Sequence, residues 1–225
     1  EKARPSMEGC GVDVFTTVEQ EYFAIRNAAT LYDLTPMVKY RVAGPDAQRY
    51  LNRLVTRDVA RLKVNRVSYC VWCDDSGHVI DDGTIFRLGE QEYRLCTAER
   101  QIDWLLDSAR GFDVQVEEVT EQIAALALQG PTSCALLKRL GLAGVELLKP
   151  FELGTFETTG LRLTVSRTGY TGDLGYELWV APQDAIALWD ALRSVRRDRP
   201  PPSLPVTPES AFMYLHGEPA HGAHG

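Results

Sequence analysis

Residues 67–88, VSYCVWCDDSGHVIDDGTIFRL, contain the pattern that decides the fold of this chain. Residues 67–74 alternate with a period of two, Val-Tyr-Val-Cys against Ser-Cys-Trp-Asp, which is typical of a half-buried strand rich in β-branched and aromatic residues. The run from Asp74 to Gly77 consists of turn-forming residues, and a return strand follows from His78 to Phe86. The stretch therefore predicts a β-hairpin.

Asp81 and Asp82 lie in the middle of the return strand, where aspartate is uncommon. Neighbouring side chains of a strand point to opposite faces, so the two acids cannot share one role. A carboxylate on the inner face needs a charge, a donor or a ligand, which makes one of the pair a candidate functional residue. An edge strand with both acids in water is the alternative, and the residues alone leave both interpretations open.

Around this hairpin, the sequence predicts an α+β chain of two related units, residues 28–110 and 111–195. The first unit is predicted to add strands over 37–42 and 92–96 and helices over 47–54 and 101–109. The second is predicted to contain strands over 114–119, 123–129, around 156, 161–165 and 177–180, and helices over 133–140 and 183–195. Gly44-Pro45-Asp46 and Gly130-Pro131-Thr132 each follow a predicted strand and open a helix, with Asp46 as the expected cap of its helix.

The two ends of the chain are predicted to be less regular. Residues 1–11 are predicted as loop, and residues 21–27 as a short helix capped by Thr16 or Thr17. Residues 28–33 are interpreted as the segment through which the chain leaves that helix. The run RRDRPPPSLP, which starts at residue 196, cannot continue a helix, so residues 196–225 are predicted as a proline-rich linker and a truncated C-terminal segment.

Composition excludes several classes of function. The 225 residues are 44% hydrophobic and 24% charged, as in a globular protein, and the net charge of −7 argues against a nucleic-acid partner. No apolar run reaches the roughly 20 residues that cross a bilayer, and no signal-peptide pattern is present, so we expect no membrane partner and a cytoplasmic location. Five cysteines, an odd number in a chain of this length, fit a reducing compartment.

We expect no metal site. Cys70 and Cys73 have no second pair at zinc-binding spacing, and His216, His221 and His224 fall in what is predicted to be a flexible end.

Four strings in the chain carry a resemblance to a known family. They are YDLTPMVKYRVAGPDAQRYLNRLVTRDV, DDSGHVIDDGTIFRLGEQEYRL, ALALQGPTS and SRTGYTGDLGYELWV. Their sequence and order over residues 20–195 resemble the folate-binding core of the glycine-cleavage T-protein, or aminomethyltransferase, family. The resemblance implies a folate-binding domain over residues 1–195 and transfer of a one-carbon unit to N5 of tetrahydrofolate.

The resemblance also implies roles for individual residues. Asp82 would be the catalytic acid near N5, Tyr170 and Glu177 would bind the pterin, and Met37 and Tyr93 would line the folate pocket. A glutamate can accept two adjacent N–H donors from the guanidine-like edge of a pterin, as carboxylates do from arginine. Gly169, Gly172 and Gly175 would let the backbone approach a flat ligand, although a plain loop between two strands is the alternative.

The carbon donor stays open at this stage. The resemblance implies an aminomethyltransferase with the lipoylated H-protein as its partner, whereas the N-terminal segment is also similar to folate-dependent demethylases of methylated small molecules. Glu209-Ser210 resembles the folate domains of dimethylglycine and sarcosine oxidising enzymes. A non-catalytic folate-binding relative is a further alternative, although its KGCYxGQE-like motif is not found. The large C-terminal barrel domain of the family has no counterpart in the 225 residues, so we expect it to be absent.

Overall fold

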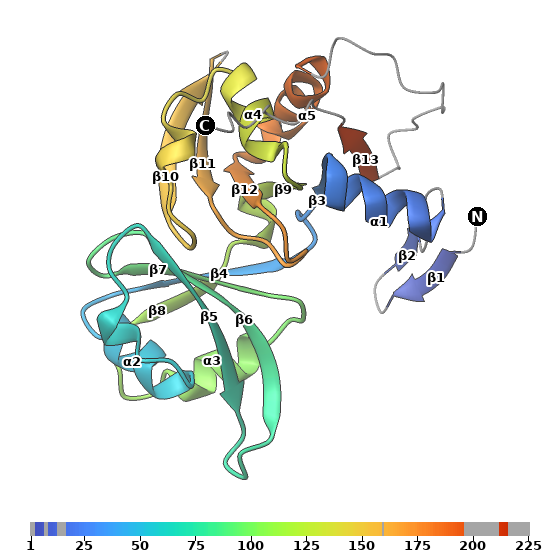
Figure 1. The fold of residues 1–225 in the computed structure, drawn as a ribbon. Helices are drawn as coiled ribbons and strands as arrows, with labels where there is room; N and C mark the ends of the chain where they lie inside the picture. The colour runs from blue at the N-terminus through green and yellow to red at the C-terminus, as the bar shows by residue number, and fades with distance from the viewer. Residues whose placement is uncertain (1–2, 7–8, 13–16, 159, 196–211, 216–225) are drawn as a thin grey trace, which may run out of the picture. The chain divides into compact units, whose positions relative to one another are not determined.

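The computed structural model describes residues 3–6, 9–12, 17–158, 160–195 and 212–215, and places side chains over 17–158 and 160–195 (Figure 1). The chain divides into two compact units, and each unit is formed by separate segments. Unit 1 comprises Glu1–Leu34, Ala125–Leu148 and Thr155–Gly225, and unit 2 comprises Thr35–Ala124 and Lys149–Gly154. Each unit combines a β-sheet with helices, so the predicted α+β class is confirmed.

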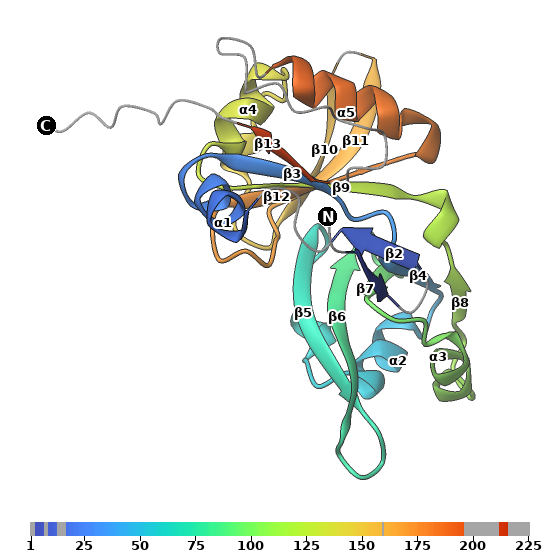
Figure 2. The ribbon, with the colours of Figure 1, turned by 90° about the vertical axis from the view of Figure 1, so that its right-hand side faces the viewer.

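Unit 2 is built on a five-stranded sheet with the order β5-β6-β7-β4-β8, in which every pairing is antiparallel. Its elements are β4 (Val38–Ala43), α2 (Ala47–Leu54), β5 (Arg66–Cys73), β6 (Val79–Arg87), β7 (Glu92–Thr97), α3 (Ile102–Ser108) and β8 (Gln115–Glu118). The predicted hairpin is confirmed as β5 and β6, and its turn extends beyond the other strands (Figure 2). A register shift between Trp72 and Cys73 marks a bulge near that turn.

The core of unit 2 lies between this sheet and the helices α2 and α3. Tyr50 and Leu51 of α2 and Leu105 of α3 pack against sheet residues such as Trp72 and Ile85, and all five are almost fully buried. The Tyr50 hydroxyl donates to the Leu105 carbonyl at 2.8 Å, which ties the two helices together inside the core. The opposite face of the sheet therefore carries the other set of alternating side chains, Asp82 among them.

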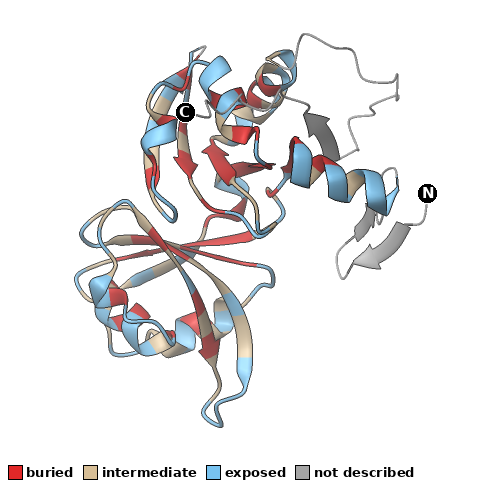
Figure 3. Ribbon diagram, in the orientation of Figure 1, coloured by how far each residue is buried: buried red, intermediate tan, exposed pale blue. Residues whose placement is uncertain are grey.

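Unit 1 is built on a six-stranded sheet with the order β10-β11-β12-β9-β3-β13. Its elements are α1 (Val18–Asn27), β3 (Ala29–Asp33), β9 (Ala124–Gln129), α4 (Ser133–Arg139), β10 (Leu153–Thr158), β11 (Leu161–Ser166), β12 (Gly175–Val180), α5 (Ala185–Ser194) and β13 (Phe212–Leu215). All residues of β9 and β12 are buried, as expected for inner strands covered on both faces (Figure 3).

Local sequence signals account for several element boundaries. Thr17 caps α1 by accepting a hydrogen bond from the Gln20 amide at 3.2 Å, which confirms one of the two predicted caps. Helix α2 has the predicted bounds, but Asp46 does not cap its first turn. Instead, the Asp46 carboxylate accepts from the Asp113 amide at 3.1 Å and binds Arg49 at 2.7 Å.

Two predictions for the chain ends were wrong. Residues 29–33, which were predicted only to lead away from α1, form the strand β3, because their backbone pairs with β9 on one side and with β13 on the other. Residues 1–11, predicted as loop, include the paired strands β1 (Ala3–Ser6) and β2 (Gly9–Val12). Within the predicted linker and C-terminal segment, residues 212–215 form β13, while residues 196–211 and 216–225 lie outside the described residues.

The observed units also differ from the consecutive pair predicted at 28–110 and 111–195. Strand β3 pairs with β9, so the segment up to Leu34 belongs to unit 1 together with residues that follow Ala124. Residues 149–154 return to unit 2, where the Val67 amide donates to the Phe151 carbonyl at 2.9 Å. Among the described residues, we find no helix with both the length and the apolar character needed to cross a bilayer.

Candidate functional site

Glu177 of β12 lies in a cluster of hydroxyl groups inside unit 1. Thr168 donates to Oε2 of Glu177 at 2.6 Å, and Ser166 donates to the same oxygen at 3.4 Å. The register of β11 and β12 places Ser166 directly opposite Glu177, which explains why these side chains meet. The indole N–H of Trp179 donates to Ser166 at 3.1 Å and holds that hydroxyl in place. We call Ser166, Thr168, Glu177 and Trp179 the Glu177 cluster.

The Glu177 carboxyl group is buried, with only 9% of the residue exposed. Burial raises the pKa of Glu177 above its usual value, and the hydrogen bonds from Thr168 and Ser166 oppose that rise. Both hydroxyl groups bind Oε2, and among the described residues no hydrogen bond is made to Oε1. This oxygen can therefore accept donors from a ligand.

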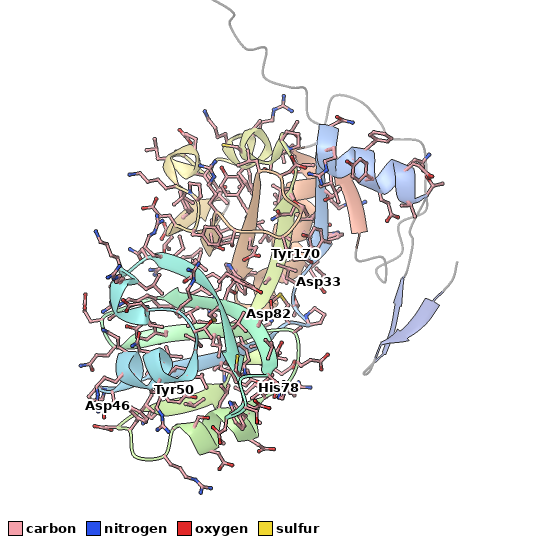
Figure 4. The ribbon with its side chains drawn as sticks, turned by 60° about the horizontal axis from the view of Figure 1, so that its bottom comes forward. Asp33, Asp46, Tyr50, His78, Asp82 and Tyr170 are labelled. Atoms are coloured by element: carbon pink, nitrogen blue, oxygen red, sulfur yellow. The ribbon has the colours of Figure 1, made fainter. Side chains whose placement is uncertain are left out.

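Tyr170, labelled in Figure 4, lies in the loop between β11 and β12, and 71% of the residue is exposed. Its ring meets the buried ring of Tyr32 edge-on, with 5.9 Å between the ring centroids. The same loop is held at Asp173, which forms an ion pair with Arg26 of α1 at 2.5 Å. The loop thus presents an aromatic ring from a fixed backbone, within the same unit as the Glu177 cluster.

A residue that sequence reasoning did not single out, Gln129, anchors this loop. Its amide group is fully buried and donates to the carbonyls of Thr168 and Tyr176, at 3.1 and 3.3 Å. Its Oε1 accepts from the Thr171 hydroxyl at 3.3 Å. The available signal in the sequence was a polar amide at the end of a strand predicted to be buried on both faces.

Asp81 and Asp82 point to opposite faces of the unit 2 sheet, as predicted. Asp81 lies opposite the buried Trp72 and shares the face that packs on α2 and α3, whereas Asp82 lies opposite Val71 on the other face. The Oδ2 atom of Asp81 is shielded from water and has no hydrogen-bond partner among the described residues. Burial raises the pKa of Asp81, and the charge of Asp82 adds to that rise.

Asp82 is exposed and carries its carboxylate on the hairpin, closer to the sheet than His78 (Figure 4). The neighbouring strand places Tyr69 on the same face, since Tyr69 lies opposite Thr84. A hydrogen bond between the Tyr69 hydroxyl and the Asp82 carboxylate raises the pKa of Tyr69. Asp82 thus has a neighbour that can orient its carboxylate.

Tyr93, another predicted site residue, lies on the other face of the sheet from Asp82. Tyr93 of β7 is fully buried on the sheet face that packs on α2 and α3, with Arg87 over its ring at 5.5 Å. Because Asp82 is on the opposite face, the structure does not bring Tyr93 and Asp82 together. Met37 is partly exposed in the bend that precedes β4. Within the described part of the chain, no group of three or more His, Cys, Asp or Glu residues could hold a metal ion.

Comparison with known proteins gives consistent matches. Residues 8–199 match the model of the family described as the GCVT N-terminal domain. The chain is 39% identical over 180 residues to an aminomethyltransferase of Bacillus subtilis strain 168, covering 78% of this chain and 49% of that protein. It is 34% identical over 190 residues to an aminomethyltransferase of Lysinibacillus sphaericus strain C3-41, covering 82% of this chain and 52% of that protein. The chain therefore spans about half the length of the curated relatives that it matches.

Solved structures agree with this result. The crystal structure of glycine cleavage system aminomethyltransferase T from Bartonella henselae superposes with a TM-score of 0.74 at 30% identity, covering 85% of this chain and 53% of that chain. Heterotetrameric sarcosine oxidase from Corynebacterium sp. U-96 superposes with a TM-score of 0.53 at 16% identity, covering 81% of this chain and 94% of that chain. The second match shows a shared fold.

Proposed function

Because the chain belongs to the GCVT N-terminal domain family, we propose that it takes part in one-carbon transfer to tetrahydrofolate, as an aminomethyltransferase. The observation that carries the proposal is the buried carboxylate of Glu177, which receives hydroxyl groups on Oε2 and, among the described residues, no hydrogen bond on Oε1. The names of the aminomethyltransferases that the chain resembles support the choice of reaction.

The Glu177 cluster fits one edge of a pterin. A pterin presents adjacent nitrogen donors, and a carboxylate fixed by two hydroxyl groups can receive them without moving. The exposed ring of Tyr170 offers a flat apolar surface in the same unit. Tetrahydrofolate supplies the amine nitrogen that accepts the carbon unit, while the residues of this chain bind and orient it.

Asp82 is proposed as the acid that acts near that amine. Its exposed carboxylate, oriented by Tyr69, can hold a proton or stabilise positive charge that develops on the transferred carbon. Met37 and Tyr93 remain proposals as folate-pocket residues. As donor we propose an aminomethyl group carried by a lipoylated H-protein, since the resembling structure is a glycine cleavage system protein.

The test is a calorimetric titration with tetrahydrofolate. Replacing Glu177 by Ala leaves ligand donors unpaired, so binding should weaken by about 1–3 kcal/mol, or roughly 5- to 150-fold. The matched control is Glu157→Ala, which alters an exposed glutamate of β10 in the same unit. Equal affinity of the Glu177 variant and the wild type would remove Glu177 as the pterin anchor, and no binding by the wild type would overturn the proposed function.

A further inference from the structure

We propose that Gln129 is a positioning residue, which sets the spacing between Thr168 and Glu177 and so prepares the Glu177 carboxylate for its ligand. The identity of that ligand rests on the proposed function, but the geometric role of Gln129 does not. Among the described residues, Gln129 makes no hydrogen bond to the Glu177 carboxylate. Its amide nitrogen binds backbone carbonyls on both sides of the cluster, and its Oε1 accepts from the Thr171 hydroxyl.

The hydrogen bonds of Gln129 bracket the Glu177 cluster. Its Nε2 donates to the carbonyl of Thr168, a residue whose hydroxyl binds Glu177, and to the carbonyl of Tyr176, the residue immediately before Glu177. One amide nitrogen therefore holds the backbones that carry both partners of the 2.6 Å hydrogen bond. Because Gln129 lies on β9 and is fully buried, its own position is fixed by the sheet.

Two glycines of the loop make room for this amide. A Cβ atom at Gly169 would lie 1.9 Å from Oε1 of Gln129, and one at Gly175 would lie 2.0 Å from the same oxygen. Such distances exclude any side chain at either position unless Gln129 moves. Gly169 and Gly175 were predicted to let the backbone approach a flat ligand. In the structure they let the backbone approach the Gln129 side chain.

The loop also has anchors that do not involve the Gln129 side chain. The Gly130 amide donates to the Leu174 carbonyl at 2.7 Å, and Asp173 is paired with Arg26. Loss of the Gln129 amide should therefore loosen the spacing at the Glu177 cluster while the loop stays attached to the sheet and to α1. The effect of Gln129 on the Glu177 cluster can therefore be measured separately from the attachment of the loop.

The first experiment needs no ligand. Gln129→Met keeps the length of the side chain and removes both donors and the acceptor, while Gln183→Met is the matched control at an exposed position. We expect carboxyl-carbon NMR titration of Gln129→Met to show the pKa of Glu177 moving down toward its ordinary value, because water reaches the loosened cluster. An unchanged Glu177 titration in a folded Gln129→Met variant would overturn the proposal.

The second experiment is a double-mutant cycle on tetrahydrofolate affinity. If Gln129 acts through Glu177, Gln129→Met should weaken binding by about 5- to 30-fold in the wild-type background and by much less when Glu177 is already Gln. An equal loss in both backgrounds would mean that Gln129 only supports the fold, and would overturn the proposal. If the wild type fails to bind tetrahydrofolate, the proposed function falls, and the ligand-free titration alone decides the role of Gln129.

A milder variant covers the case in which Gln129→Met does not fold. Thr171→Val removes only the hydroxyl that donates to Oε1 of Gln129, at a partly exposed position. The Glu177 titration should shift in the same direction and by less than expected for Gln129→Met. No shift in Thr171→Val, together with an unfolded Gln129→Met, would count against a positioning role and for a purely structural one.

Discussion

The main-chain amide of Asp82 donates to Oδ1 of Asp81 at 2.8 Å, although the two side chains point to opposite faces of the sheet. The carboxylate of Asp81, on the core face, therefore holds the backbone of Asp82, whose side chain is on the other face. This relationship gives Asp81 a role that differs from that of Asp82, with consequences for activity that can be separated by substitution.

Asp82→Asn is expected to reduce one-carbon transfer by about 10²- to 10⁴-fold, the usual contribution of a positioned acid–base group. The amide keeps the shape of the side chain and its contact with Tyr69 but removes the charge. Asp81→Asn keeps an oxygen that can accept from the Asp82 amide, so its effect on turnover should be far smaller. Turnover is measured with aminomethylated H-protein and with methylated small molecules as donors. A rate loss confined to Asp81→Asn would reverse the assignment, and full activity of both variants would exclude the hairpin from catalysis.

Glu177→Gln should stabilise the protein at neutral pH while weakening its ligand affinity. The folded-state pKa of Glu177 is raised by burial, so the folded state keeps a proton that the unfolded chain releases more readily. The free energy of unfolding of the wild type therefore falls as pH rises from the ordinary glutamate pKa, about 4.3, through the raised value. The substitution removes this loss.

Urea unfolding at several pH values measures this effect. The stability difference between Glu177→Gln and the wild type should be smallest below about pH 4 and should grow as pH rises. The control Glu157→Gln, at an exposed position, should show no such growth. A difference that is constant with pH would contradict the raised pKa.

Asp74 is expected to make the tip of the hairpin sensitive to acid. Its Oδ1 accepts from the amides of Ser76 and His78, both at 2.9 Å, and the His78 amide contributes most to holding the pKa of Asp74 below its usual value. This contribution to stability is present above the ordinary aspartate pKa, about 3.9, and is lost as pH falls through the depressed value.

Amide hydrogen exchange at Ser76 and His78 reports on this turn. Exchange protection should fall at low pH in the wild type, while Asp74→Asn should lose this acid dependence because its side chain does not titrate. The neighbouring Asp75→Asn, at an exposed position, is the control and should keep the wild-type profile. Identical pH profiles for Asp74→Asn and the wild type would refute the assignment.

Gly83→Ala should destabilise unit 2 by about 1–3 kcal/mol, the usual cost of an overpacked site. A Cβ atom at residue 83 would lie 2.2 Å from the Cys96 carbonyl oxygen, which belongs to the backbone of the adjacent strand and cannot move aside cheaply. Gly89→Ala is the matched control, since its Cβ would meet the nearest atom at an ordinary 3.7 Å. Denaturant unfolding that gives the two variants equal stability would contradict the close approach of these strands.

Sequence patterns predicted the elements whose signals are local. The β5–β6 hairpin and α2 follow from alternation, turn residues and a proline before the helix, and each of these acts within a few residues. Strand β3 was missed because Ala29 to Tyr32 are all buried. The strand therefore lacks the alternation of apolar and polar residues that is typical of a strand with one face in water. Its identity depends on β9 and β13, which are distant in sequence.

The candidate site was predictable only in part for the same reason. Alternation predicted that Asp81 and Asp82 face opposite ways, but which one faces the core depends on the pairing of Asp81 with Trp72. Glu177 was identified through the resemblance, whereas its partners Ser166 and Thr168 follow from the register of β11 and β12. The role of Gln129 depends on contacts across 39 and 47 residues, for which no local pattern exists.

The pairing of β3 also sets the order in which unit 1 can be made. Thr30 of β3 pairs with Gln129 across 99 residues, and the other neighbour of β3 is β13, which is made later still. During synthesis, the apolar strand therefore leaves the ribosome with both edges unpaired while nearly all of unit 2 is translated. Long-range pairing of this kind slows folding and leaves an open strand edge free to join other chains. We therefore expect β3 to make the nascent chain dependent on chaperones until Gln129 has emerged.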